Sequence, residues 1–252
     1  MLAVDRRKFI LKRVTIENSI TVSQLAEELT VTEETIRRDL LKLENDGLIN
    51  RVHGGATIKS QEKEDLPYST RNIQHTEEKK KIAEIAINLI PDSASIMADS
   101  SSTVFGLIKE IDEKIKDAVV ITNSSYLVFM FNSSSIRLIS TGGTLRRNSY
   151  SLVGSLAMEA LNKYYADFGI FSCKAISLDG FVMDSNEQDA DIKKIMLQKS
   201  KKIILLADSS KFSKKSFVNM FELTDIDVIV TDKRPENQWI EACKKYNIEL
   251  FY

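Results

Sequence analysis

The 252-residue sequence predicts an α/β protein of two domains, a small helical one with a hairpin and a larger one around a mainly parallel sheet. Up to residue 58, apolar residues recur at helical spacing and then form two short segments around a glycine pair. Beyond residue 76, short apolar segments alternate with amphipathic ones, as in parallel sheets covered on both faces. The polar stretch between them contains Pro67, so we expect domains at 1–58 and 77–252 joined by a linker over 59–76.

The small domain begins with three predicted helices. Apolar side chains at helical spacing predict the first helix over about 5–18. Thr21 or Ser23 can cap a short second helix, and Thr32 can cap a third one over 33–44. The segment 48–58, with glycines at its centre, is typical of a hairpin.

The third predicted helix and the hairpin fit a winged helix-turn-helix. In this motif the second of the two helices places its N-terminal side chains in the major groove of DNA. The third predicted helix buries Ile36, Leu40 and Leu43 on one face and leaves its N-terminal turn outward. Arginine serves both as a guanine reader and as a phosphate clamp, so the role of each arginine stays open. The expected DNA contacts come from this turn and from the hairpin: Thr32, Glu34, Thr35, Arg37, Arg38, Arg51, His53 and Gly54.

Charge does not decide between DNA binding and a protein-interaction module. The whole chain has 35 basic and 36 acidic residues, and residues 1–59 contain ten basic and nine acidic ones. Cys173 and Cys243 are far apart and lack a nearby histidine cluster, which predicts reduced thiols and no metal site. The sequence has no apolar run of about 20 residues and no signal-peptide pattern, which predicts a cytoplasmic protein without a membrane partner.

The larger domain is predicted from its alternating segments. Strands are expected at 95–99, 118–122, 136–140, 167–171, 202–208, 227–232 and 248–252. Helices are expected near 78–90, from 102, from 124, and near 156–163, 189–199 and 236–246.

Polar residues follow several of these strands, where free backbone N–H groups at a helix start attract anions. Serines and threonines at such a position can also simply cap the helix, and single lysines are often solvated. Because three strand ends can converge at one edge of a parallel sheet, we expect an effector site there. Its expected residues are Asp99, Ser100, Ser101, Ser102, Thr103, Thr122, Asn123, Gly142, Gly143, Lys193 and Lys211.

The run ITVSQLAEELTVTEETIRRDLLKLENDGLINRVHGGA (20–56) resembles the helix-turn-helix signature of the DeoR family, with TIRRDL and RVHGGA as its most specific parts. The runs ADSSSTV, VVITNS, STGGTLR, SLVG, DADIKKIM and LLADSSKF resemble the sensor domain of that family, which is similar in fold to ribose-5-phosphate isomerase. The resemblance implies a motif at about 20–39 and a phosphate contact at Ser100, Ser101, Ser102 and Thr103. In the family this loop usually has Gly and Thr where Ser101 and Ser102 stand.

This resemblance implies a repressor of a sugar or carbohydrate operon that binds double-stranded operator DNA and responds to a phosphorylated sugar; activators are a minority. A sugar-phosphate isomerase is the alternative, but Asp179 and Asp184 lack the spacing of its catalytic carboxylates. The sequence contains no nucleotide-binding glycine motif and no nucleophile beside a base, so neither catalysis nor a cofactor is expected. Because one small reading head contacts few bases, we expect a homodimer or a higher homo-oligomer.

Overall fold

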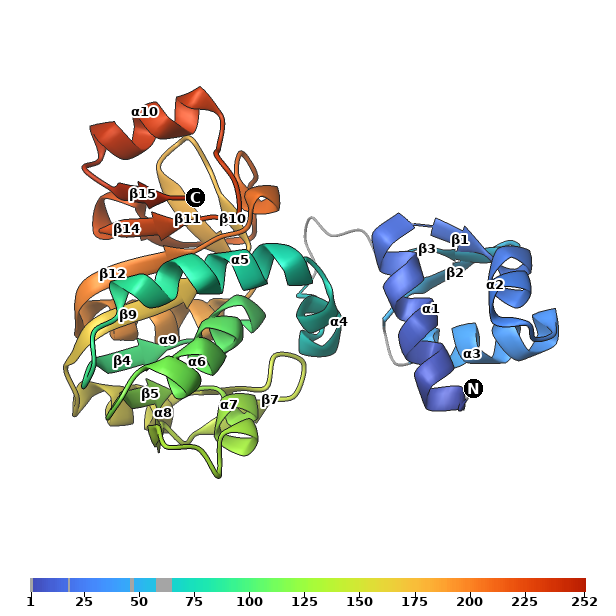
Figure 1. Cartoon of the computed structure of the whole chain (residues 1–252), viewed down its shortest axis with the longest axis horizontal. Helices are drawn as coiled ribbons and strands as arrows, with labels where there is room; N and C mark the ends of the chain where they lie inside the picture. Colours follow the sequence, from blue (N-terminus) through green and yellow to red (C-terminus); the bar gives the residue numbers. More distant parts are fainter. Residues whose placement is uncertain (1, 18, 46–47, 58–64) are drawn as a thin grey trace. The chain divides into compact units, whose positions relative to one another are not determined.

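The computed structural model describes residues 2–17, 19–45, 48–57 and 65–252, and the chain divides into two compact units, 1–74 and 75–252 (Figure 1). Part of the predicted linker, residues 59–64, lies outside the described residues. Its described part includes helix α4 (Tyr68–Ile73), which the sequence analysis missed because it treated Pro67 as a breaker. Proline at a helix start is compatible with the helix, since its fixed φ suits the first turn.

The smaller unit contains the predicted helices and hairpin. Besides α4, its elements are α1 (Ala3–Glu17), β1 (Ser19–Thr21), α2 (Val22–Leu29), α3 (Glu33–Asn45), β2 (Asn50–Val52) and β3 (Gly55–Thr57). The strands form an antiparallel sheet in the order β1–β3–β2. Ile10, Leu25, Ile36, Leu40 and Ile49 are buried together in its core.

Local hydrogen bonds explain where the helices of this unit begin. Thr21 Oγ1 accepts from the Gln24 backbone N–H at 3.2 Å, and Gln24 Oε1 accepts from the Thr21 N–H at 3.0 Å, so a capping box starts α2. Thr32 Oγ1 likewise accepts from the Thr35 N–H at 3.3 Å before α3. Strand β1 was not predicted. It pairs so closely with β3 that a Cβ at Gly55 would lie 2.3 Å from the carbonyl oxygen of Ile20.

The larger unit is built on seven parallel strands in the order β15–β14–β12–β9–β4–β5–β6. Their bounds are β4 (Ser95–Ala98), β5 (Val119–Thr122), β6 (Arg137–Ser140), β9 (Ala166–Ser172), β12 (Ser200–Leu206), β14 (Val228–Val230) and β15 (Glu249–Phe251). The chain builds outward from β4 through β5 to β6 and then from β9 in the opposite direction. The order therefore reverses between β4 and β9, the position at which open parallel sheets bind ligands.

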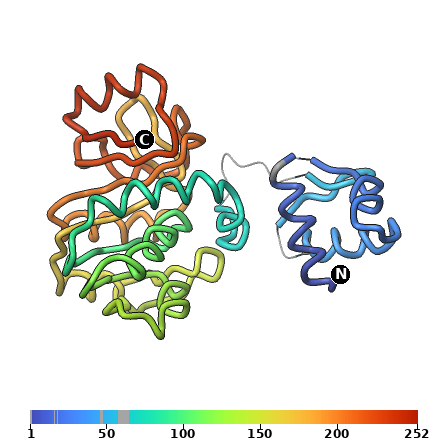
Figure 2. Tube along the Cα trace, viewed as in Figure 1, coloured from blue at the N-terminus to red at the C-terminus, as the bar shows by residue number. Residues whose placement is uncertain are grey.

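Helices cover both faces of this sheet, as the trace in Figure 2 also shows. Helices α5 (Thr76–Ala86), α6 (Ser102–Lys114) and α7 (Ser125–Met130) pack on one face. Helices α8 (Ser155–Asn162), α9 (Glu187–Gln198) and α10 (Asn237–Lys245) pack on the other. Ile96 and Met97 are both fully buried but belong to the two different cores, because successive strand residues point to opposite faces. The predicted mainly parallel α/β fold is confirmed.

Two smaller pieces of sheet were not predicted. Strands β7 (Thr144–Arg146) and β8 (Ser151–Val153) form an antiparallel hairpin. Strands β10 (Ala175–Ile176), β11 (Phe181–Asp184) and β13 (Val218–Glu222) form a separate antiparallel sheet. Strands of two to five residues show too little periodicity to be recognised, and the pairing of β11 with β13 also depends on a neighbour distant in sequence. Over the described ranges, no helix combines the length and the apolar character that a membrane crossing requires.

Candidate functional site

Helix α3 carries an exposed face at its N-terminal end. Thr32, Glu34, Arg37 and Arg38 are exposed and Thr35 is half-buried. Arg38 has 80% of its side chain exposed and forms a loose ion pair with Glu34 at 3.5 Å. Arg37 pairs with Glu33 at 2.7 Å. Exposed pairs of this kind contribute little stability, so either guanidinium can leave its glutamate for a nucleic acid.

The opposite face of α3 is held by an aspartate that sequence analysis missed. Asp39 is 3% exposed, and its carboxylate accepts from Arg6 at 2.5 Å and from Arg7 at 3.4 Å, both on α1. The TIRRDL run therefore has two roles, since Ile36 and Asp39 face inward while the two arginines between them face solvent. The position of Asp39, three residues after a core isoleucine, is the signal that could have revealed it.

The hairpin beside α3 has the exposed tip that a wing needs. Arg51, His53 and Gly54 are exposed, and Gly54 has a φ of +80°, a conformation that favours glycine. The Arg51 guanidinium lies 3.6 Å from the Glu44 carboxylate at the end of α3. This pair connects the hairpin to the helix that precedes it.

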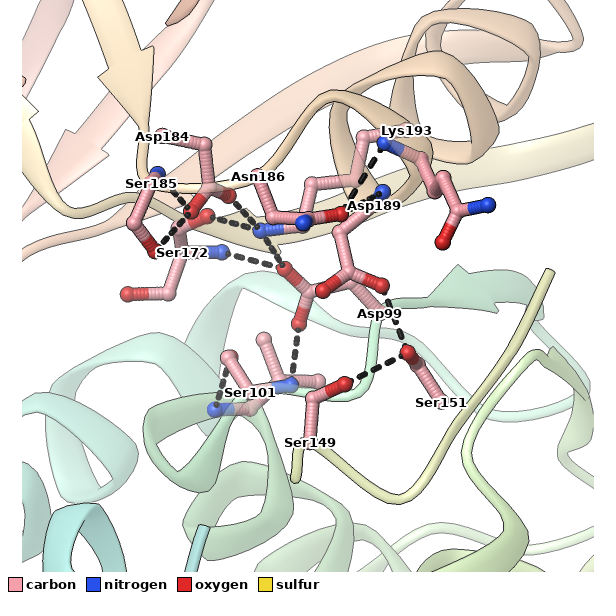
Figure 3. Close-up of polar contacts among 12 residues, drawn as sticks. Asp99, Ser101, Ser149, Ser151, Ser172, Asp184, Ser185, Asn186, Asp189 and Lys193 are labelled. Atoms are coloured by element: carbon pink, nitrogen blue, oxygen red, sulfur yellow. Dashed lines mark hydrogen bonds and ion pairs between the residues drawn. The ribbon is translucent and has the colours of Figure 1, made fainter. Parts of the chain in front are cut away.

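In the larger unit, Asp99 organises the edge of the sheet at the strand reversal. Its Oδ1 accepts from the Ser101 N–H at 2.9 Å, and its Oδ2 accepts from the Ser172 N–H at 3.0 Å across the reversal (Figure 3). Oδ2 also lies 2.9 Å from the Lys193 ammonium. Asp99 is fully buried and both its oxygens are engaged, so it holds the loop that follows in place.

Lys193, on α9, is buried between two carboxylates. Its ammonium lies 2.9 Å from Asp99 and 2.7 Å from Asp184 at the end of β11, and it donates to the Ser172 carbonyl at 2.9 Å (Figure 3). Burial alone would lower the pKa of this ammonium, but Asp184 and Asp99 outweigh it and raise the pKa above its usual range. The predicted cation is thus already compensated by two anions.

The hydroxyl residues after Asp99 form a buried row at the start of α6. Ser100, Ser101, Ser102 and Thr103 are each at most 8% exposed. Ser101 caps the helix, since its Oγ accepts from the Val104 N–H at 3.2 Å. Its φ of −80° shows that serine stands at this position without backbone strain.

The ends of β5 and β6 lie at different distances from the end of β4. Thr122 Oγ1 donates to the Ala98 carbonyl at 2.7 Å, which connects the end of β5 to the end of β4. Gly142 and Gly143 follow β6, two strands from β4, and both have positive φ. A Cβ at Gly143 would lie 2.6 Å from the Val153 carbonyl oxygen, so this glycine permits close packing against β8.

Lys211 reaches the strand reversal from the end of β12. Its ammonium donates to Ser172 Oγ at 2.7 Å and lies 3.6 Å from Asp208. Burial alone would raise the pKa of Asp208, but Lys211 and Ser210 outweigh it and hold the pKa below its usual range. Ser172 therefore joins the two predicted cations, because Lys193 bonds its carbonyl and Lys211 its hydroxyl. Its position directly after a predicted strand could have identified it.

A second polar cluster fixes the β7–β8 hairpin to α9. Asp189 on α9 pairs with Arg146 of β7, and its Oδ1 accepts from Ser151 Oγ at 2.5 Å. Ser151 Oγ lies 2.7 Å from Ser149 Oγ (Figure 3). Asp189 stands one helical turn before Lys193, so the same stretch of α9 contacts both the hairpin and the sheet edge. Sequence analysis did not identify Arg146 or Ser151.

The described residues contain no group of three His, Cys, Asp or Glu side chains arranged to hold a metal ion. What they do contain is a helix with two exposed arginines, Arg37 and Arg38, in one unit and, in the other, buried hydroxyls beside the N-terminus of a 13-residue helix. The first arrangement can contact a polyanion in its grooves, and the second can accept a small anion.

Comparison with known proteins agrees with this division. A family model described as a DeoR-like helix-turn-helix domain matches residues 6–62, and one described as the DeoR C-terminal sensor domain matches residues 74–233. The uncharacterized HTH-type transcriptional regulator YulB of Bacillus subtilis is 35% identical, over 99% of this chain and 96% of its own length. The HTH-type transcriptional repressor GlcR of the same organism is 34% identical over the same shares.

An activator is also among the relatives. The L-fucose operon activator of Haemophilus influenzae is 33% identical, over 96% of this chain and 97% of its own length. Among solved structures, a ribose-5-phosphate isomerase in complex with phospho-erythronic acid is 20% identical over 54% of each chain, with a TM-score of 0.42.

Proposed function

The chain belongs to the DeoR family of helix-turn-helix transcriptional regulators, and on that premise we propose that it represses a carbohydrate operon under the control of a phosphorylated sugar. In this proposal residues 1–58 bind operator DNA and residues 77–252 bind the effector. Residues 59–76 link the two domains. No catalytic step is assigned to the larger domain.

The DNA part of the proposal is supported by the asymmetry of α3. Its inner face is fixed by Ile36 and by the buried Asp39, while Arg37 and Arg38 remain exposed with weakly held partners. A helix anchored in this way can present side chains to base edges without rearranging its own domain. Arg51, His53 and Gly54 would contact the backbone beside it.

The effector part is carried by one observation, the buried row of hydroxyls from Ser100 to Thr103 at the strand reversal and the N-terminus of α6. Phosphate oxygens accept several hydrogen bonds, and a helix N-terminus offers both donors and a favourable dipole. Lys211, which also pairs with Asp208, is connected to this row through Ser172 and Asp99. The carbohydrate class is supported by the similarity to the L-fucose operon activator, which matches this chain over 97% of its own length.

Thermal unfolding of the full chain against sugar phosphates and the corresponding free sugars tests the effector. Stabilisation by a phosphate ester, but not by its free sugar, would support the proposal. Ser102→Ala and Lys211→Met should remove that stabilisation while DNA binding persists. No stabilisation by any ester would contradict the sugar-phosphate assignment and leave DNA binding untouched.

DNA binding is tested with genomic fragments selected by the protein and then measured by fluorescence anisotropy. Arg38→Ala should weaken binding to the selected fragment by about tenfold if Arg38 reads a base, with specificity relaxed at one position. Arg234→Ala is the control, because Arg234 is an exposed arginine of the larger unit. Equal affinities for wild type and Arg38→Ala would rule out this role.

We also propose that the protein acts as a homodimer or a higher homo-oligomer, because one winged helix-turn-helix reads few base pairs and repeated half-sites require repeated reading heads. Sedimentation velocity of the protein alone and with the selected fragment tests this. A monomer at micromolar concentration in both conditions would contradict it.

A further inference from the structure

Asn123 presents a buried hydrogen-bond acceptor that has no partner. The residue is 2% exposed, and its Oδ1 is buried without a hydrogen-bond partner among the described residues. Asn123 directly follows β5, whose last residue, Thr122, stands opposite Ala98 of β4. It therefore lies beside Asp99, at the beginning of the row of hydroxyls. A buried acceptor without a partner is costly, and among the described residues of this unit only Ser177 Oγ and Ser216 Oγ are also buried without one.

The orientation of the Asn123 amide is fixed by the β7–β8 hairpin. Its Nδ2 donates to the Leu152 carbonyl at 3.3 Å, and its backbone carbonyl accepts from the Leu152 N–H at 2.7 Å. A bridge between Ser124 and Ser151 continues this pairing. Rotating the amide by half a turn would place Oδ1 against the Leu152 oxygen, so the group that Asn123 offers to its surroundings is an acceptor.

We propose that Asn123 determines the specificity of the effector site by accepting a hydrogen bond from a hydroxyl on the carbon skeleton of the effector. This inference rests on the effector site assigned above and names the part of the ligand that Asn123 reads. Phosphate oxygens near neutral pH are acceptors, so they cannot satisfy Oδ1. The row of hydroxyls and the α6 N-terminus suit the phosphate, and Asn123 suits a hydroxyl next to it. The ligand class is therefore a polyhydroxylated phosphate ester.

Selectivity follows from the burial of Oδ1. A ligand without the hydroxyl leaves this acceptor without a partner in the complex as well, and sites with buried polar groups reject such analogues strongly. We expect a polyol phosphate to bind about 10- to 100-fold more tightly than a phosphate ester of similar size without hydroxyls. The Leu152 backbone holds both the Asn123 carbonyl and its side-chain amide, so the orientation of the amide is fixed before the ligand arrives. Oδ1 itself is buried, so neighbouring groups have to move to admit the hydroxyl.

The test measures dissociation constants by isothermal titration calorimetry with the full chain. The probes are glycerol 3-phosphate, glucose 6-phosphate and fructose 1-phosphate as polyol esters, propyl phosphate and inorganic phosphate as probes without hydroxyls on carbon, and free glycerol and glucose. Asn123→Leu removes the amide at similar volume. Asn123→Ala provides a second variant that keeps the backbone pairing with Leu152. Thr15→Val is the control, since Thr15 Oγ1 is a buried oxygen without a partner in the other unit.

The expected result is that at least one polyol ester binds wild type about 10- to 100-fold more tightly than propyl phosphate, and that both Asn123 variants reduce it to the propyl phosphate level. Propyl phosphate and inorganic phosphate should bind these variants as they bind wild type. Thr15→Val should match wild type throughout. On wild type alone, equal binding of the polyol esters and propyl phosphate would already overturn the inference, even if a variant does not fold.

Other outcomes separate this inference from the proposed function. If the Asn123 variants weaken polyol and hydroxyl-free esters equally, Asn123 is a structural residue and the inference fails while the phosphate site stands. If free glycerol or glucose binds as tightly as its ester and depends on Asn123, the inference stands and the phosphate assignment fails. Absence of binding by every probe to wild type would overturn both.

Discussion

Lys193→Met should strongly destabilise the larger unit. The Lys193 side chain is 7% exposed and stands between Asp99, which is fully buried, and Asp184. Methionine preserves much of the chain length and the apolar packing but removes the positive charge that compensates Asp99 in this contact. The substitution therefore isolates the electrostatic contribution of Lys193 from its packing.

The size of the loss in unfolding free energy follows from the burial of this ion pair. Removing one partner of a buried ion pair costs about 3–5 kcal/mol, because the remaining charge loses its compensation. Asp99 keeps the Ser101 and Ser172 N–H groups as donors, so we expect the lower end, about 3 kcal/mol. For a unit of this size, each kcal/mol shifts Tm by about 2–4 °C, which gives a decrease of about 10 °C.

Because the pKa of Lys193 is raised in the folded state, its stabilisation is complete below the unfolded lysine pKa of about 10.4 and is lost only as pH rises through the folded value. The difference in Tm should therefore be constant between about pH 6 and pH 9 as far as Lys193 is concerned. Thermal unfolding followed by circular dichroism measures it, with Lys194→Met, a less buried lysine next along α9, as the control. A loss under about 1 kcal/mol would refute the argument.

Three further predictions concern other parts of the chain. Asp39→Ala should destabilise the smaller unit by about 2 kcal/mol in urea unfolding, because Arg6 and Arg7 lose their shared partner, whereas the exposed Asp5→Ala should have little effect. Gly143→Ala should cost about 3 kcal/mol in the same assay, more than Gly142→Ala, because a Cβ at Gly143 would lie 2.6 Å from the Val153 carbonyl oxygen whereas one at Gly142 would meet open space. Burial raises the pKa of Cys173 to about 12, so iodoacetamide at about pH 8 should label it only after unfolding; rapid labelling of the native protein would contradict its burial.

The alternation of the larger unit could be predicted from sequence because its strands are short apolar runs and its helices have a clear period. The elements that were missed have neither property. Strands β7 and β8 belong to a hairpin whose position depends on Asn123 and on Asp189, residues of other elements. Such pairing is a tertiary effect, and local pattern carries little trace of it.

Part of the candidate effector site could also be predicted from the sequence, and part could not. Its hydroxyl row could be located because the carboxyl ends of parallel strands share one edge. The sequence could not show which of its charged residues are paired with opposite charges. Lys193 was predicted as a cation for the effector, and the structure places it between Asp99, which follows β4, and Asp184 of β11. Whether a lysine is available or compensated depends on which carboxylates the fold brings within about 4 Å of it.

Asp189→Asn should loosen the β7–β8 hairpin without unfolding the sheet. The substitution keeps the shape of the side chain but removes the charge that pairs with Arg146, and it turns one oxygen that accepts from Arg146 or Ser151 into a donor. A hydrogen bond to a charged group contributes about 1.5–3 kcal/mol, so amide exchange over residues 144–153 should accelerate by about 10- to 100-fold.

The hairpin would still be held at its other side, where Leu152 pairs with Asn123 and the Ser125 N–H donates to the Tyr150 carbonyl at 2.9 Å. Hydrogen exchange followed by mass spectrometry should therefore show the change in the hairpin and not in β4 or α6. Because the same hairpin orients the amide of Asn123, this variant should also lose part of its preference for hydroxylated esters. Faster exchange spread over the whole sheet, or none in the hairpin, would show that Asp189 stabilises the unit in general rather than anchoring this hairpin.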